Sequence, residues 1–326
     1  MTSNRYTGLD GWRGISIALV LIGHLFPVGP KSWQLNGAVA GTGMVVFFIL
    51  SGFLITCLLL RDDHIGKFLV RRMMRVVPLA WLGVTFSLLG QQVDNFSIYW
   101  RHWAFIANWL PMALTSGTSH IWSLCVEMQF YVGAALLVGV FRKRAALLVP
   151  LLAIGTTMLR GIEEKTMVIN TQYRVDEILA GCCLALWYTK WPESCAQWLS
   201  RVPFWPLAML LLMSAHPTFG GLNYLRPYLA MVLIGVTLTG AGPTSVQTFL
   251  QNRILAYLAS ISFALYVIHG CLDWTWLATG DTFAKYLKRP LFLVVVFGLA
   301  HSSTFYFERY FIALGKRWTS SARPAC

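Results

Sequence analysis

Long apolar segments recur along almost the whole chain and constrain its fold more than any other feature. A helix needs about 20 mainly apolar residues to cross a bilayer, and Gly and Pro tend to mark the ends of such segments. By this criterion the candidate spans lie at 12–29, 37–60, 74–92, 120–141, 145–160, 174–190, 202–216, 226–242, 254–272 and 291–312. The sequence therefore predicts an all-α polytopic membrane protein of about ten transmembrane helices. We expect one integral-membrane domain over residues 1–326, with no appended soluble domain.

The composition agrees with a membrane protein and excludes several other classes. Hydrophobic residues make up 56% of the chain and charged residues only 12%, against about 25% charged in soluble domains. The aromatic content of 14% argues against disorder. The seven cysteines are scattered and show no metal-ligand spacing, so we expect neither a disulfide framework nor a bound metal.

The net charge of +13 would suggest nucleic acid in a soluble protein. In a multispanning protein, cytoplasmic loops collect Lys and Arg, so the charge predicts topology and no nucleic-acid partner. With a cytoplasmic N-terminus, 15 Lys and Arg residues fall in inside segments and 8 in outside segments. This bias predicts that both termini are cytoplasmic.

The first span carries two ionisable residues that need an explanation, because a charge inside a bilayer costs about 2.5–3.5 kcal/mol on insertion scales. Arg13 and His24 are eleven residues apart, which places them on one helix face about 16 Å apart along the axis. A topology anchor would explain Arg13, and a structural hydrogen bond would explain His24. The functional alternative is that His24 accepts a proton from a hydroxyl near neutral pH.

The fourth span supplies a polar stripe. Ser123, Glu127 and Tyr131 follow i, i+4, i+8 spacing and share one face. Glu127 lies about 10 Å below the outer end of its span, a depth similar to that of His24. In many active sites a carboxylate orients the catalytic base, so Glu127 could orient His24. The alternative is that Glu127 makes a structural hydrogen bond between spans.

A basic cluster precedes the third span, in FLVRRMMRVVP at Phe68–Pro78. Arg72 and Arg75 stand one helical turn apart on one face. Positive-inside anchoring accounts for part of the cluster. The functional interpretation is a clamp for phosphate groups, for which guanidinium forks are well suited.

Weaker signals occur elsewhere. In the second span, Gly43 and Gly52 permit close backbone approach, and Ser51 adds a polar group. The pairs Glu308/His301 and Tyr266/His269 are explained adequately by polar contacts between helices. The loop at 93–119 is rich in aromatic residues, which indicates an interfacial belt or, alternatively, a platform for sugar rings or lipid.

Several of these segments together resemble the acyltransferase 3 family of bacterial membrane-bound O-acyltransferases. The matching strings occur in family order: LDGWRGISIALVLIGH (Leu9–His24), GMVVFFILSGFLIT (Gly43–Thr56), FLVRRMMRVVP (Phe68–Pro78), HIWSLCVEMQFY (His120–Tyr131), YRVDEILAGCCLA (Tyr173–Ala185) and ISFALYVIH (Ile261–His269). The resemblance spans nearly the whole chain. Trp12 and Met128 depart from the usual pattern, and neither replaces a proposed catalytic group.

The resemblance implies a ten-span enzyme that transfers an acyl group, usually acetyl, from acyl-CoA to a hydroxyl of an extracytoplasmic glycan, lipid-linked sugar or small acceptor. It assigns catalytic roles to Arg13, His24 and Glu127. The family's Arg-x-x-Arg motif, which would hold the CoA phosphates, falls on Arg72 and Arg75. Three further residues are expected to bind substrate: Ser51, Ser123 and Tyr131.

The resemblance also implies a bacterial inner-membrane location and O-acetylation of a polysaccharide. Acyl-CoA is then the co-substrate, with acetyl-CoA the first choice. Acceptor recognition falls to the spans and loops, or to a separate partner protein. The rival function is a transporter or flippase for a lipid-linked sugar. Transporters often contain inverted repeats with broken helices, and the sequence shows no such repeat.

Overall fold

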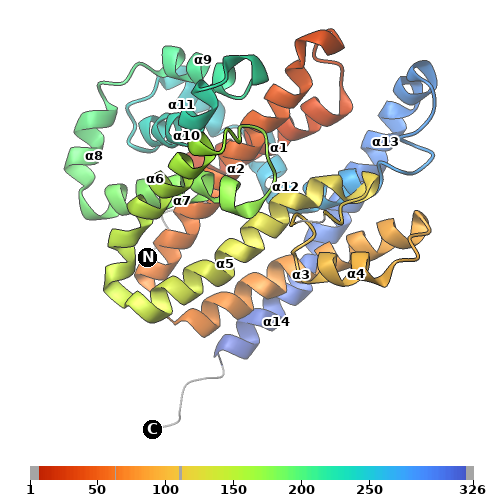
Figure 1. The fold of residues 1–326 in the computed structure, drawn as a ribbon, viewed down its shortest axis with the longest axis horizontal. Coiled ribbons are helices and arrows are strands. Elements are labelled where there is room, and N and C mark those ends of the chain that lie inside the picture. The colour runs from red at the N-terminus through yellow and green to blue at the C-terminus, as the bar shows by residue number, and fades with distance from the viewer. Residues whose placement is uncertain (1–6, 63, 110–111, 321–326) are drawn as a thin grey trace. The chain divides into compact units, whose positions relative to one another are not determined.

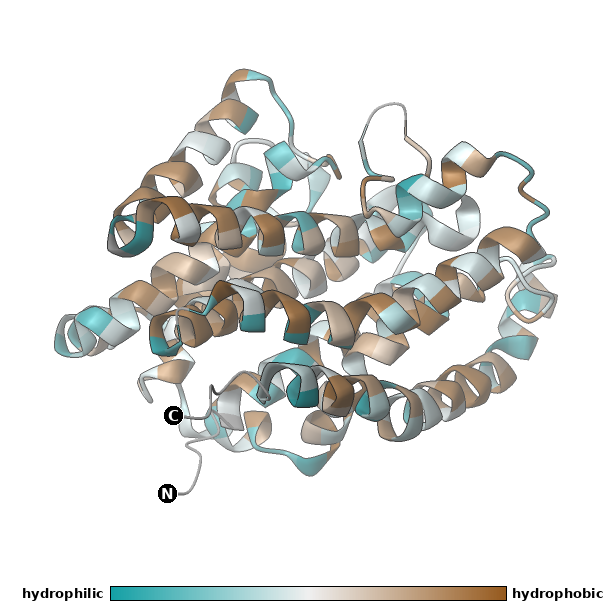
Figure 2. Ribbon diagram, turned by 90° about the horizontal axis from the view of Figure 1, so that it is seen from below, coloured by the Kyte–Doolittle hydropathy of each residue, from teal (hydrophilic) through white to brown (hydrophobic). Residues whose placement is uncertain are grey.

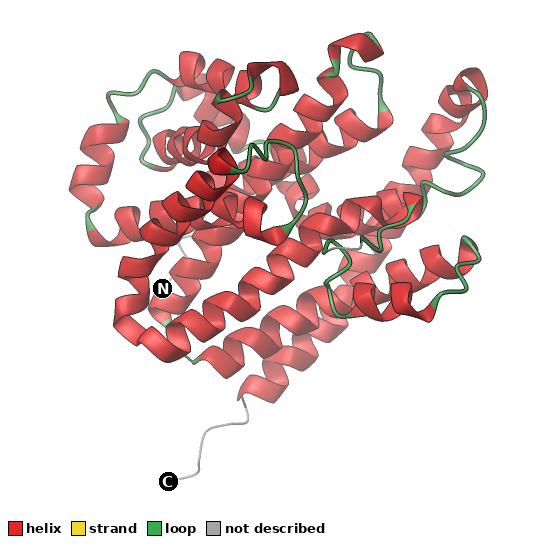
Figure 3. Ribbon diagram, in the orientation of Figure 1, coloured by secondary structure: helices red, strands yellow, loops and turns green. Residues whose placement is uncertain are grey.

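We analysed a computed structural model of the chain, which describes residues 7–62, 64–109 and 112–320. Helices joined by turns and loops make up this part of the chain, and it contains no strand (Figure 3). The predicted all-α class is therefore confirmed for the described residues. Both termini lie outside those residues, so their cytoplasmic placement stays a prediction.

Six helical segments of the described chain are long and apolar enough to cross a membrane. They are α2 (Leu35–Arg61), α3 (Ile65–Gly90), η2 with α5 (Ser116–Phe141), α6 (Ala145–Ile162), α12 (Arg253–Cys271), and the continuous run of α13, η5 and α14 (Thr282–Ser320). Hydrophobic residues occupy long stretches of the helices (Figure 2). These segments support a multipass membrane protein.

The other four predicted spans are also helices: α1 (Thr7–Leu25), α7 (Thr171–Lys190), α9 (Phe204–Ser214) and α10 (Leu222–Leu238). With 11 residues, α9 is about 16 Å long, which is shorter than a bilayer core of about 30 Å. The helices predicted from the apolar pattern are thus present, whereas the total of ten spans stays a prediction. Three short helices complete the set of α-helices: α4 (Phe96–Trp103), α8 (Pro192–Leu199) and α11 (Thr244–Leu250).

The chain divides into two compact units. Unit 1 comprises residues 1–62 and 141–260, and unit 2 comprises residues 63–140 and 261–326. Each unit is assembled from segments far apart in sequence. The boundary at residue 260 falls within α12, so the first part of this helix belongs to unit 1 and the second part to unit 2.

Small residues set the helix packing of unit 1. A Cβ atom on Gly52 of α2 would lie 2.0 Å from the carbonyl oxygen of Ile178 on α7, and one on Gly181 would lie 2.1 Å from that of Ile49. Close approach of two backbones is what small residues allow in membrane helices. Gly43 makes a similar contact with α1, as the sequence predicts for Gly43 and Gly52.

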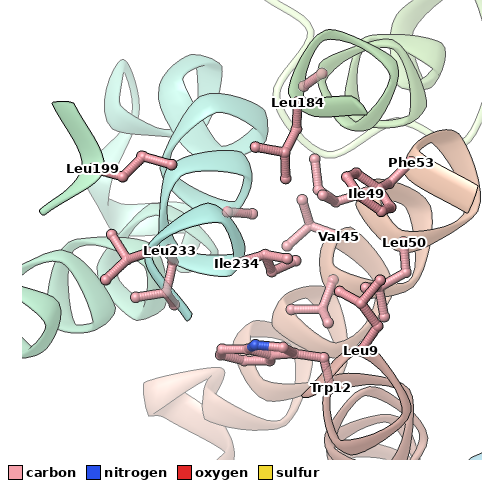
Figure 4. Packing of buried hydrophobic residues seen from close by; sticks show 14 of the residues in the cluster. Leu9, Trp12, Val45, Ile49, Leu50, Phe53, Leu184, Leu199, Leu233 and Ile234 are labelled. Atoms are coloured by element: carbon pink, nitrogen blue, oxygen red, sulfur yellow. The ribbon is translucent and has the colours of Figure 1, made fainter. Parts of the chain in front are cut away.

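An apolar core lies between α1, α2, α7 and α10 in unit 1 (Figure 4). Trp12 contributes a large ring to this core, and its indole N–H donates to Thr237 Oγ1 at 2.8 Å. The hydrogen bond satisfies a donor that burial would otherwise leave unpaired. Trp12 is therefore a core residue of unit 1.

In unit 2, α14 (Arg309–Ser320) runs alongside α3 (Figure 1). A Cβ on Gly315 would lie 2.9 Å from Met74 Cβ, so the helices are in close contact there. Arg71 Nε donates to Thr319 Oγ1 at 2.9 Å across the same pair of helices. These contacts hold the basic end of α3 in place.

Candidate active site

The two arginines predicted to bind phosphate lie half-buried on one side of α3. The Arg72 guanidinium lies 5.8 Å from the centre of the Tyr131 ring, a cation–π contact. Among the described residues, neither Arg72 nor Arg75 has a hydrogen-bond acceptor or an ion-pair partner within 4 Å. A guanidinium carries five N–H donors, and no described acceptor uses those of Arg72 and Arg75.

Glu127 and Tyr131 lie next to these arginines on α5. The Tyr131 hydroxyl donates to Glu127 Oε1 at 2.6 Å, and both residues are buried. Phe68 of α3 packs edge-on against the Tyr131 ring, at 6.0 Å between ring centres. The predicted stripe therefore forms an internal hydrogen bond, which fixes the rotamer of the carboxylate.

A second carboxylate, Glu308, belongs to the same region of unit 2. It is buried within the π-helical turn η5 (Ser303–Glu308), where Thr304 Oγ1 donates to its Oε1 at 3.0 Å and Ser303 Oγ donates at 3.3 Å. Arg75 interacts electrostatically with Glu308, Glu127 and Tyr131. Inserted π turns are frequent at functional sites.

We call Arg72, Arg75, Glu127, Tyr131 and Glu308 the arginine–carboxylate site. For Glu308, as for His301, the sequence predicts only a polar contact between helices. The signal that could have identified it is a carboxylate deep in an apolar helical run of 39 residues.

Ser123 bonds to a residue of α12, whereas Glu127 and Tyr131 of the same stripe interact with the arginines. Tyr266 of α12 donates its hydroxyl hydrogen to the carbonyl oxygen of His120, so Ser123 Oγ acts as the donor to the Tyr266 hydroxyl at 2.5 Å. His120 Nε2 donates to the carbonyl oxygen of Val267 at 3.1 Å. These bonds connect α5 to α12, in agreement with the helix-contact interpretation of Tyr266. Substrate binding by Ser123 stays a prediction.

The remaining predicted residues belong to unit 1. Arg13 and His24 lie on the single uninterrupted helix α1, so the predicted helical spacing between them holds. Arg13 is half-buried, and His24 is exposed in the last turn of the helix. Ser51 is buried on α2 beside Gly52. The pairing of His24 with Glu127 joins residues of different units and stays a prediction.

The aromatic loop of unit 2 is anchored by side-chain hydrogen bonds. The indole N–H of Trp109 donates to Gln129 Oε1 at 2.8 Å, and that of Trp103 donates to Thr85 Oγ1 at 3.1 Å. His102 is buried between the carbonyl oxygen of Ile98, 2.8 Å from its Nδ1, and the Thr118 hydroxyl, 2.9 Å from its Nε2. Burial lowers the pKa of His102. Trp109 itself remains substantially exposed, which fits both interpretations of this loop.

No group of His, Cys, Asp and Glu side chains that could hold a metal ion occurs among the described residues. The cysteines at positions 57, 125, 182, 183, 195 and 271 are free thiols in the structure.

Comparison with known proteins identifies a family and several relatives of this chain. The family model for an acyltransferase domain, Acyl_transf_3, matches residues 6–309. YrhL of Bacillus subtilis strain 168, provisionally named a peptidoglycan O-acetyltransferase, is 26% identical over 313 residues, covering 80% of this chain and 48% of that protein. A Staphylococcus aureus strain COL protein, provisionally named an O-acetyltransferase, is 25% identical over 80% of this chain and 50% of its own length.

The peptidoglycan O-acetyltransferase OatA of Listeria monocytogenes is 27% identical over 227 residues, covering 58% of this chain and 35% of that protein. The chain thus spans about half the length of the first two relatives and less of the third. No solved structure matches the chain. Because the family model covers almost the whole chain, the chain belongs to the acyltransferase 3 family.

Proposed function

We propose that this protein is an acyl-CoA-dependent O-acyltransferase that transfers an acyl group, acetyl first among the candidates, to a hydroxyl of an extracytoplasmic or lipid-linked glycan. The observation that carries the proposal is the pair of half-buried arginines, Arg72 and Arg75, which have no hydrogen-bond acceptor within the described part of the chain. The donor is expected on their side of the membrane because the basic loop before α3 is the predicted cytoplasmic side. Family membership and the names of the relatives support acyl transfer.

The arginines would bind the diphosphate and phosphate groups of CoA through charge-assisted hydrogen bonds. A Lys would offer only a point charge, whereas two guanidinium forks on one helix face can each engage two phosphate oxygens. Glu127 and Glu308 would keep these cations oriented without saturating them, because each carboxylate already accepts from a hydroxyl.

The transfer step would use His24 as the general base. As the acceptor oxygen attacks the thioester carbonyl carbon, its proton moves to the imidazole. The C–S bond then breaks, and the CoA thiolate receives that proton from the imidazolium. Glu127 would support the cationic imidazolium, and Arg13 would hold the CoA arm or stabilise the oxyanion. An acyl-His24 intermediate is the alternative route.

Binding of the acyl-CoA donor tests the role of Arg72 and Arg75, and it can be measured before the acceptor is known. We would titrate acetyl-CoA and free CoA into the detergent-solubilised wild type, the Arg72→Ala/Arg75→Ala double variant and an Arg71→Ala control. Arg71 lies on the same helix turn but donates to Thr319. Loss of two charge-assisted contacts should weaken binding by about 100-fold or more, while the control should stay within about threefold.

Absence of saturable binding by folded wild-type protein, or equal losses in the control and the double variant, would contradict the proposal. His24→Ala provides a separate test of the chemistry. Removal of a general base should lower acetyl transfer by about 10²–10⁴-fold while acetyl-CoA binding stays unchanged. Full turnover by this variant would remove His24 from the mechanism.

A further inference from the structure

One buried arginine of unit 2 has no role in the proposed reaction. Arg289 lies on α13 about two turns after the helix begins, next to the predicted span 291–312. Its side chain is only 4% exposed. By the predicted topology, this end of α13 is extracytoplasmic. A buried charge is costly without compensating contacts, so the surroundings of Arg289 need an explanation.

The helix turns Arg289 away from the lipid. Phe292, Val296 and Ala300 are buried and share its helix face. The opposite face carries an exposed apolar stripe, formed by Phe283, Leu287, Leu291 and Val294. Such a stripe on a membrane-crossing helix is expected to face the acyl chains. A snorkelling arginine would lie on the stripe and extend to the lipid headgroups, so snorkelling does not explain Arg289.

The preceding residue, Lys288, makes the bonds expected of a structural cation. Its Nζ donates to the carbonyl oxygens of Trp276 and Thr279 at 2.6 and 2.7 Å, and it lies 4.9 Å from the centre of the Trp276 ring. Asp281 caps the helix, because its Oδ1 accepts from the backbone N–H of Ala284 at 2.7 Å. The loop before α13 is therefore fastened to the helix without a hydrogen bond from Arg289.

The donors of Arg289 are used differently. Its Nε and Nη1 atoms are buried and have no hydrogen-bond acceptor among the described residues. No described carboxylate oxygen lies within 4 Å of the guanidinium. Asp273 attracts it electrostatically from further away, and solvent screens that attraction because Asp273 is exposed. The indole N–H of Trp274, next to Asp273 in the chain, is another buried donor without a described acceptor.

Two aromatic rings flank the Arg289 guanidinium. Its central carbon lies 5.9 Å from the centre of the Tyr286 ring and 5.5 Å from that of Phe292. These residues stand one turn before and one turn after Arg289 on α13. Cation–π contacts attract the charge and orient the planar group, but they do not supply the oxygen atoms that its N–H groups require. A planar guanidinium fork matches the oxygens of phosphate and carboxylate groups.

We propose that Arg289 binds an anionic group of the acyl acceptor, a phosphate or a carboxylate, at the extracytoplasmic end of unit 2. The proposal rests on the proposed function, since the ligand is the acyl acceptor of that reaction. The anionic oxygens would accept from buried donors that no described residue satisfies, and leaving such donors unpaired is costly. The protein would accordingly prefer an anionic saccharide to a neutral one of the same size.

Equilibrium binding of three probes to the full-length, detergent-solubilised protein tests this preference. N-acetylglucosamine 1-phosphate carries a phosphate, glucuronic acid carries a carboxylate, and N-acetylglucosamine carries neither. We expect the wild type to bind at least one anionic probe about tenfold or more tightly than the neutral sugar. The preferred anionic probe identifies the source of the charge. A wild type without any preference would overturn the proposal.

Three variants locate the preference. Arg289→Gln should lose it, whereas Lys285→Gln, which removes a cation one turn earlier on α13, should keep it. The Arg72→Ala/Arg75→Ala variant should also keep it, because the anionic probe is not expected at the donor site. Loss of the preference in this double variant but not in Arg289→Gln would assign the probe to the donor site and overturn the proposal. A lower unfolding temperature of Arg289→Gln with the preference intact would likewise overturn it.

Arg289→Lys covers the case in which Arg289→Gln does not fold. It keeps the charge but not the fork, so it should retain only part of the anionic preference, and full retention would contradict a role for the fork. Acetyl-CoA binding measured on the same samples separates the two proposals. An anionic preference that depends on Arg289, in a protein that does not bind acetyl-CoA, would contradict the proposed function alone.

Discussion

Buried arginines in the two units have opposite surroundings. In unit 1, Arg160 and Arg226 are fully buried, and each donates to a carboxylate at 3.0 Å or less. In unit 2, Arg72 and Arg75 are half-buried and have no acceptor among the described residues. We therefore expect removal of Arg160 or Arg226 to leave a buried carboxylate without its cation, whereas removal of Arg72 or Arg75 breaks no hydrogen bond to a described residue.

The buried ionisable residues of unit 1 that form ion pairs, which we call the charge cluster, differ from the arginine–carboxylate site in their acids as well; they are Arg160, Arg174, Asp176, Glu177 and Arg226. Asp176 and Glu177 accept from guanidinium groups, so their charge is used in pairs. Glu308 accepts from the hydroxyls of Thr304 and Ser303. A carboxylate held by hydroxyls keeps its full negative charge available for neighbouring cations. We therefore expect substitutions in the charge cluster to lower the stability of the fold, and substitutions in the arginine–carboxylate site to lower the activity.

The largest effect on stability is expected in the charge cluster. Glu177→Gln removes the carboxylate that both Arg174 and Arg226 contact, so the buried guanidinium of Arg226 loses the anion to which it donates. We expect the free energy of unfolding to fall by about 3–5 kcal/mol. Thermal unfolding in detergent measures this loss, with the exposed Glu164→Gln as the control. Equal unfolding temperatures for the two variants would show that Glu177 does not stabilise the fold.

A smaller effect is expected from the hydrogen bond inside the arginine–carboxylate site. Tyr131→Phe removes the donor at 2.6 Å from Glu127 and leaves a buried carboxylate oxygen with one donor fewer. The cost should be about 1–3 kcal/mol, with a fall in acetyl transfer because Glu127 is less well oriented. Unfolding temperature and transfer rate are both measurable on this variant. An unchanged unfolding temperature together with an unchanged transfer rate would show that Tyr131 does not contribute to the site.

His102 sharpens the comparison because it is a fully paired group within unit 2. Burial lowers its pKa, so the folded protein holds it neutral while the unfolded chain binds a proton near pH 6.5. Its stabilising contribution is therefore complete above that pH. It is lost as the pH falls from about 6.5 through the lower folded pKa, by at most about 1.4 kcal/mol per pH unit.

Unfolding temperatures of the wild type and His102→Gln at pH 7.5 and 5.5 test this contribution. The wild type should lose more stability on acidification than the variant. Identical pH dependence in the two proteins would contradict the expected effect of burial.

Much of the fold follows from the apolar pattern. Every predicted span overlaps a helix, because runs of about 20 apolar residues have few alternatives to a helix in a membrane protein. The close packing at Gly43 and Gly52 also follows from the sequence, since only small residues permit it. The length of α9 could not be predicted, because hydropathy does not reveal where a helix ends in a loop.

The site was predictable only where its residues share one helix. The spacing of Arg72 with Arg75 and of Glu127 with Tyr131 gives the correct neighbours. The contribution of Glu308 depends on tertiary contacts between α3 and the π turn, for which the sequence has no periodic signal. The charge cluster was missed for the same reason, because its five members come from three helices.

Thermal unfolding of the Arg72→Ala/Arg75→Ala variant, with and without acetyl-CoA, tests the central claim most directly. Since neither arginine has a hydrogen-bond acceptor or a close ion-pair partner among the described residues, the variant without ligand should unfold within a few degrees of the wild type or above it. Saturating acetyl-CoA should stabilise only the wild type, as expected of a ligand that binds the folded state. A variant that unfolds far below the wild type, or that acetyl-CoA stabilises equally well, would show that these arginines belong to the fold and not to the donor site.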